Sequence, residues 1–170
     1  MRVRGKCWGA LCGLAAVLFV IPSAATDLLG DLQARFDRET NGVHKAKMMG
    51  ALGDAQFEEA RRAGKAGDHS TVALTLEKYR DNVRAALDAL KKQHPDAEKS
   101  SNGYRQLQVH VHRGIREVEE SLLVAPEPYK PPLEIVREDL IVMDDELLKM
   151  LFPRRPLNTP AAPASPEKQP

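Results

Sequence analysis

Apolar residues recur every three or four positions through most of residues 26–152, which is the period of an amphipathic α-helix. Runs with the alternating pattern of a β-strand are nearly absent. The pattern therefore predicts an all-α fold, an antiparallel up-and-down bundle of four to five helices. Four turn signals divide the region: Asn41-Gly42, Gly67-Asp68, His94-Pro95 and a proline-rich stretch at residues 125–132.

The expected helices cover about residues 26–41, 43–66, 70–93, 101–123 and 132–152. The first one either ends at Asn41 or bends there and continues. The apolar stripes predict the side of each later helix that faces the core. They are Ala46, Met49, Leu52, Gln56, Ala60 and Ala63; Val72, Leu76, Tyr79, Val83, Ala86 and Leu90; Tyr104, Leu107, Val111, Ile115, Val118 and Leu122; and Leu133, Val136, Leu140, Met143, Leu147 and Met150.

A Gly-Asp corner lies within GKAGDHSTVALTLEKY, residues 64–79, and joins the second and third helices. Gly67 suits a left-handed helix cap, and Asp68 or Ser70 suits the start of the next helix. Over residues 57–79 the hairpin resembles one tetratricopeptide turn, which would imply a peptide-binding repeat. Such units recur every ~34 residues in at least three copies. Because no second copy follows, we interpret the hairpin as a bundle corner.

The first 25 residues have the three parts of a secretory signal peptide. Arg2, Arg4 and Lys6 form a basic start, and the apolar run at residues 11–21 is shorter than the ~20 residues that cross a bilayer. Pro22 and small residues follow. We therefore predict cleavage between Ala25 and Thr26, with no stable membrane anchor afterwards.

Both cysteines, Cys7 and Cys12, lie in this predicted signal, so the mature chain would have no disulfide. None of its asparagines begins an Asn-x-Ser/Thr site. Exported animal domains often carry such features. Their absence from the sequence favours a bacterial envelope protein, expected in the periplasm.

The last 18 residues, 153–170, are rich in proline and alanine and have no apolar period, which predicts a disordered tail. Three of the 25 basic residues lie in the predicted signal, which leaves 22 against 24 acidic residues. A nucleic-acid surface would show a clustered basic excess. We therefore expect no nucleic-acid partner.

Two segments resemble helical domains of unknown function in exported bacterial proteins. One is FEEARRAGKAGDHSTVALTLEKYRDNVRAALDAL, residues 57–90, with a glutamate- and alanine-rich hairpin. The other, LEIVREDLIVMDDELLKMLFPRRP at residues 133–156, is similar to the C-terminal helix of secreted acidobacterial proteins. The resemblance implies an envelope location and an all-helical fold, and it implies no activity.

VHVH, residues 109–112, is the most metal-like stretch. Two residues on a helix are ~200° apart, so His110 and His112 would flank the stripe on opposite edges. One helix binds an ion with histidines four apart, as in HExxH. We therefore expect histidines at the edge of the helix interface and no metal site.

Enzyme motifs are absent from the sequence, including GxSxG, HExxH and a glycine-rich phosphate loop. A working carboxylate pair needs two acids that face each other in a pocket. The acidic residues of the fifth helix alternate with its apolar stripe, which predicts a solvated face: Glu138, Asp139, Asp144, Asp145 and Glu146. We expect no enzyme and no cofactor.

The fifth helix carries more apolar residues than one buried stripe requires, which indicates a partner surface. The candidate residues are Ile141, Leu148, Leu151 and Phe152, reached through the proline-rich linker at residues 125–132. The function expected is a non-catalytic interaction or scaffold module that contacts an envelope protein or another copy of itself. The alternative is a small-ligand or metal sensor that binds within the bundle.

Overall fold

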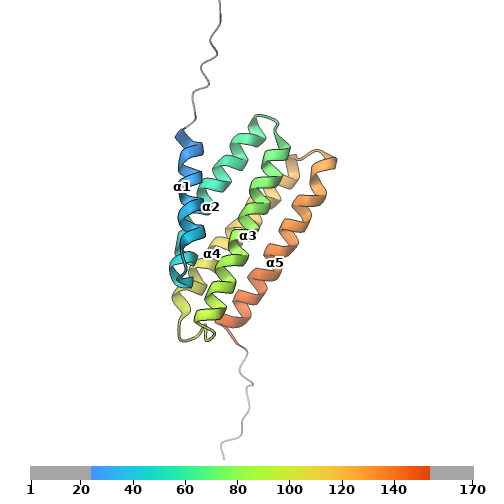
Figure 1. The fold of residues 1–170 in the computed structure, drawn as a ribbon. Helices are drawn as coiled ribbons and strands as arrows, with labels where there is room; N and C mark the ends of the chain where they lie inside the picture. The colour runs from blue at the N-terminus through green and yellow to red at the C-terminus, as the bar shows by residue number, and fades with distance from the viewer. Residues whose placement is uncertain (1–23, 154–170) are drawn as a thin grey trace, which may run out of the picture.

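A computed structural model describes residues 24–153, and within that range every regular element is a helix (Figure 1). The predicted signal core and the tail after Pro153 lie outside these residues, whereas the predicted cleavage residues Ala25 and Thr26 lie in the first turn of α1. Signal cleavage and tail disorder stay predictions. The elements are α1 (Ala24–Arg38), α2 (Gly42–Lys65), α3 (His69–Gln93), α4 (Ser101–Val124), the 3₁₀ helix η1 (Glu127–Tyr129) and α5 (Lys130–Leu151).

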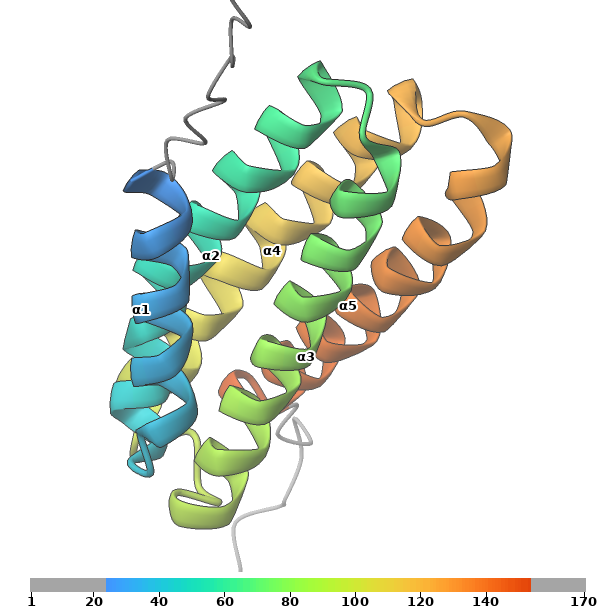
Figure 2. The ribbon, with the colours of Figure 1, turned by 45° about the horizontal axis from the view of Figure 1, so that its top comes forward.

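Successive helices run in opposite directions, which confirms the all-α up-and-down bundle (Figure 1). Helices α2, α3, α5 and α4 surround one core, each packing against the next, and α1 lies against α2 at the edge of this group (Figure 2). One face of α5 is left without a helical neighbour among the described residues. None of the helices in this range has the length and hydropathy of a membrane span.

The predicted stripes make up most of the core, which also contains Phe36, Phe57 and Leu87. Every stripe residue of α2 and α3 is buried, as are Tyr104, Leu107, Val111 and Val118 of α4. Ile115, Leu122 and Met150 are partly buried against the same core. Burial of a leucine-sized side chain contributes about 1.5–3 kcal/mol, so these stripes supply the main drive for folding.

The α2–α3 corner forms as predicted. Gly67 has a φ of 75°, and the Asp68 amide donates to the Ala63 carbonyl over 2.9 Å, the long hydrogen bond of a Schellman cap. The Asp68 carboxylate then accepts from the Thr71 amide and caps α3. Helix α3 continues to Gln93 and packs into the bundle core, so the hairpin is a bundle corner.

The α4–α5 connection differs from the extended linker predicted at residues 125–132. Only Ala125 and Pro126 are extended, and η1 and α5 follow directly. Pro131 and Pro132 lie in the first turn of α5, where a fixed φ suits the helix and the missing amide is not needed. The prolines therefore begin a helix here and do not stiffen a linker.

Candidate partner-binding surface

Two stripes run along different sides of α5. The inner one is buried in the core. The outer one points away from the other helices, and its members are spaced by four or three residues, a heptad-like pattern. It consists of Glu134, Glu138, Ile141, Asp145, Leu148 and, directly after the helix, Phe152.

Three of the four residues predicted as partner surface fall on this outer stripe. The side chain of Phe152 is 62% exposed and that of Leu148 is 37% exposed, and Ile141 is half-buried. Leu151 is different, since it is only 8% exposed and belongs to the core. It lies one helical turn beyond buried Leu147, so the pitch of α5 turns it inward and removes it from the candidate surface.

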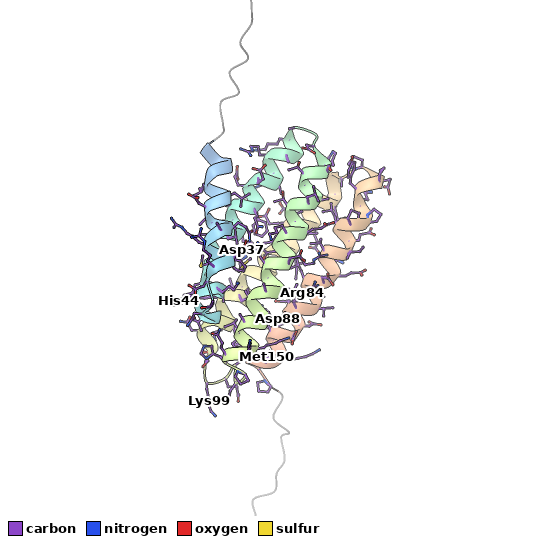
Figure 3. All side chains as sticks on the ribbon, in the orientation of Figure 1. Asp37, His44, Arg84, Asp88, Lys99 and Met150 are labelled. Atoms are coloured by element: carbon purple, nitrogen blue, oxygen red, sulfur yellow. The ribbon has the colours of Figure 1, made fainter. Side chains whose placement is uncertain are left out.

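The edge of α5 next to α3 is held by ion pairs. Arg84 Nη2 lies 3.0 Å from Asp139 Oδ2, and Arg80 Nη1 lies 3.5 Å from the same oxygen. Lys91 Nζ donates to Glu146 Oε1 over 2.9 Å, and this hydrogen bond raises the pKa of Lys91. Figure 3 labels Arg84 on the side of α3 that adjoins α5.

The edge next to α4 is held in a similar way. Gln108 Nε2 donates to Asp144 Oδ1 over 3.0 Å, and Arg137 Nε donates to Glu119 Oε1 over 2.8 Å. The expectation of a solvated acidic face is therefore wrong for Asp144, whose side chain is 13% exposed. Asp139 and Glu146 stay partly exposed, but they also pair with α3, which was not predicted. The sequence missed this because their partners come from α3 and α4, which are distant in sequence.

Apolar residues also remain exposed on the α3 side of α5. Ile135 and Val142, 56% and 65% exposed, lie two turns apart beside the carboxylates of Asp139 and Glu146. At about 100° per residue, Val142 lies a little more than a quarter of a turn round the helix from its neighbour Ile141. The excess apolar residues of α5 thus form two separate edges, whereas the sequence suggested one wide surface.

A polar pair lies at the centre of the bundle, between α3 and α4. The Tyr79 hydroxyl lies 3.0 Å from both Nδ1 and the backbone carbonyl oxygen of His110. Phe57 of α2 stacks on the His110 ring at 5.6 Å and contacts the Tyr79 ring at 4.6 Å between centroids. His110 is 9% exposed, so the expectation that it lies at an interface edge is wrong.

Two glycines make room for these rings. A Cβ atom at Gly53 would lie 2.2 Å from Cε1 of His110, and one at Gly114 would lie 2.4 Å from the Tyr79 hydroxyl. A histidine on the apolar side of a helix, with glycines one turn away on its own and the facing helix, is the sequence signal that could have placed His110 inside.

Burial sets the titration of this pair. It raises the pKa of Tyr79 and lowers the pKa of His110, because the charged form of each loses its water. Asp54 Oδ1 lies 3.5 Å from Nε2 of His110, and its negative charge opposes the lowering of the His110 pKa. The pair is therefore neutral and bound in place, an arrangement that fixes the register of α3 against α4.

A chain of ion pairs leads from this centre to the surface. Arg113 Nη1 lies 2.6 Å from Asp54 Oδ1, and Arg113 also approaches Glu117, which Arg61 Nη1 contacts at 2.9 Å. Arg61 and Glu117 line a hollow of about 460 Å³ between α2, the start of α3 and the end of α4. Apolar and charged side chains both line this hollow, and its volume suits a small ligand.

The described residues contain no group of three or more metal-ligating side chains placed to hold an ion. His110 and His112 are separated as the helix pitch predicts, with His110 inside and His112 on the surface 3.9 Å from Asp144. These two histidines are not brought together.

The chain matches no known protein-family model, no curated protein and no solved structure.

Proposed function

We propose that this chain is a non-catalytic interaction module of the bacterial cell envelope, and that it contacts its partner through the outer stripe of α5. The observation that supports this proposal is the exposure of Leu148 and Phe152, with half-buried Ile141, on the face that no other described helix covers. Exposed apolar groups of this kind gain free energy when a partner removes them from water. The envelope location rests on the signal-peptide pattern of residues 1–25.

The paired edges of α5 support the same assignment. Ion pairs and hydrogen bonds fix α5 to α3 and to α4, so its outer stripe is presented on a held scaffold. A preorganised surface loses little entropy on binding. A scaffold role needs no further chemistry from the chain.

The test is recovery of a partner by a variant with Ile141→Asp and Leu148→Asp. We expect the variant to lose a partner that the unchanged protein captures from the envelope, because two carboxylates would be desolvated in the contact. Circular dichroism and thermal unfolding check that the helices persist. Loss of the fold would assign both residues to the core and contradict the proposal.

A matched control places the same substitution at exposed positions elsewhere. Leu74 of α3 and Val109 of α4 are 63% and 67% exposed and lie away from the outer stripe. The Leu74→Asp, Val109→Asp variant should keep the partner. Equal loss from both variants would show that the stripe is not the contact.

A second candidate function is small-ligand binding in the hollow beside Arg61 and Glu117, favoured by its volume and its mixed lining. A ligand that binds only the folded state raises the midpoint of thermal unfolding by mass action. A thermal-shift screen with amphipathic small molecules would detect it. No shift with any compound would leave the hollow without a role in binding.

A further inference from the structure

We propose that the outer stripe of α5 docks a basic amphipathic α-helix of the partner protein. The inference rests on the proposed function, and it adds the chemical class and the conformation of the partner segment. It follows from the spacing, the charge and the exposure of the stripe.

The spacing favours a helix. The stripe residues, from Glu134 to Phe152, are separated by four, three, four, three and four positions. A repeat of 3.5 residues keeps one face of a helix aligned with a second helix crossing at a shallow angle. The stripe spans about 27 Å at 1.5 Å per residue, which is enough for five turns of a partner helix.

The charge favours a basic partner. Glu134, Glu138 and Asp145 are exposed and have no ion-pair partner among residues 24–153, whereas Asp139 and Glu146 are paired with α3. The unpaired carboxylates of α5 thus all lie on the outer stripe. Lysine or arginine at the flanks of a docked helix would pair with them, which sets partner choice and speeds association.

Two positively charged residues near the outer stripe leave the stripe itself negatively charged. Lys149 on α5 and Arg116 on α4 make no ion pair within the described residues, and they would border a docked helix without entering the row itself. The row contains three carboxylates and no cation. A second copy of this chain would bring three more carboxylates to the same contact, so the charge argues against self-association through this face.

The apolar and acidic residues are not evenly mixed. Glu134 and Glu138 lie in the first half of α5, whereas the apolar members Ile141 and Leu148 lie in the second half, with Asp145 between them, and Phe152 follows the helix. A complementary helix therefore carries most of its basic residues toward one end and its apolar residues toward the other. This asymmetry also fixes its direction along α5.

The binding test uses a defined probe, a synthetic 21-residue helical peptide with leucine at heptad core positions and lysine beside them. Fluorescence anisotropy at low salt should show binding to the full chain, and a charge-reversed peptide with glutamate for lysine should bind at least tenfold more weakly. The triple variant Glu134→Lys, Glu138→Lys, Asp145→Lys should reverse this preference.

A control variant makes the same change in net charge elsewhere, at Asp31, Glu77 and Glu120, which lie off the stripe. It should keep the preference for the lysine peptide. The proposal is overturned if neither peptide binds, if the control reverses the preference as the triple variant does, or if the variant with Ile141→Asp and Leu148→Asp binds the lysine peptide undiminished. Binding only after deletion of residues 154–170 would assign the stripe to the chain's own tail, and would also overturn it.

Photo-crosslinking separates this inference from the proposed function. A photoreactive residue at position 148 of the chain should crosslink to a partner segment that is helical and rich in lysine or arginine. A crosslink to a segment of other chemistry refutes the inference and leaves the interaction module standing. Absence of any crosslinked partner refutes both.

Discussion

At the scale of single residues, the Tyr79–His110 pair determines how closely the helices approach. Both rings are buried, and each occupies space that a glycine on another helix leaves free: Gly53 of α2 for the His110 ring, and Gly114 of α4 for the Tyr79 ring. Burying polar groups is costly unless they are hydrogen-bonded, and the Tyr79 hydroxyl lies within hydrogen-bond distance of Nδ1 and of the carbonyl oxygen of His110. Nε2 of His110 is buried without a hydrogen bond to any described residue, 3.5 Å from Asp54 Oδ1. The pair therefore selects one register of α3 against α4.

Gly53→Ala should destabilise the fold by roughly 1–3 kcal/mol, the usual cost of overpacking a core, because the new methyl group would overlap the His110 ring. Gly50→Ala, three positions earlier in α2, is the matched control. Its Cβ would meet nothing within 4 Å, so it should be neutral or stabilise the helix by about 0.5–1 kcal/mol. Urea unfolding measures both, and equal effects would contradict the packing described.

Stability should fall as the pH falls through the titration of His110. Burial holds the pKa of His110 in the folded chain below the ordinary value of 6.5, so the unfolded chain binds more protons as the pH drops below that value. The stabilisation is thus complete above about pH 6.5 and is lost toward the lower, folded pKa. Asp54 and Arg113 face the ring and act in opposite directions.

Urea unfolding from about pH 8 to about pH 5 checks this expectation in the range where histidine titrates. The His110→Gln variant should lose that part of the pH dependence, whatever its stability at neutral pH. His112→Gln, two residues further along α4 with an exposed ring, should keep it. An unchanged slope in His110→Gln would assign the pH dependence to other groups.

At the scale of the elements, the apolar period of the sequence was sufficient to predict which sides of α2 and α3 are buried. Every residue of their two predicted stripes is buried, and the Gly67-Asp68 corner has the predicted caps. The start of α5 could not be derived in the same way. Prolines fit both an extended linker and the first turn of a helix, and the neighbours of residues 125–132 decide between them.

The same limit explains the predicted surface of α5. The sequence determines how the residues of α5 are distributed around the helix, but not on which sides the other helices lie. One wide apolar face and two separate apolar edges therefore cannot be distinguished from the sequence. Ion pairs of Asp139 and Glu146 with α3 show which edge is occupied, and they join residues about 55 positions apart in the chain. The prediction for Leu151 was wrong because this residue lies one helical turn after Leu147 and continues the buried stripe.

At the scale of the whole molecule, the described residues form five antiparallel α-helices, and α5 packs against α3 and α4 with one side toward the core and one side uncovered (Figure 1). The all-helical fold and the antiparallel arrangement of successive helices could be predicted, because short turns bring sequential helices side by side. His110 in the centre and the split surface of α5 depend on contacts between distant residues. The function we propose uses the uncovered side.

The most direct test of that function is crosslinking in the native cell envelope from position 148 of α5, with position 74 of α3 as the control, followed by mass spectrometry. The account predicts one dominant protein joined at position 148 and absent at position 74. Recovery of the same proteins from both positions, or of none from position 148, would contradict the claim that α5 is the partner surface.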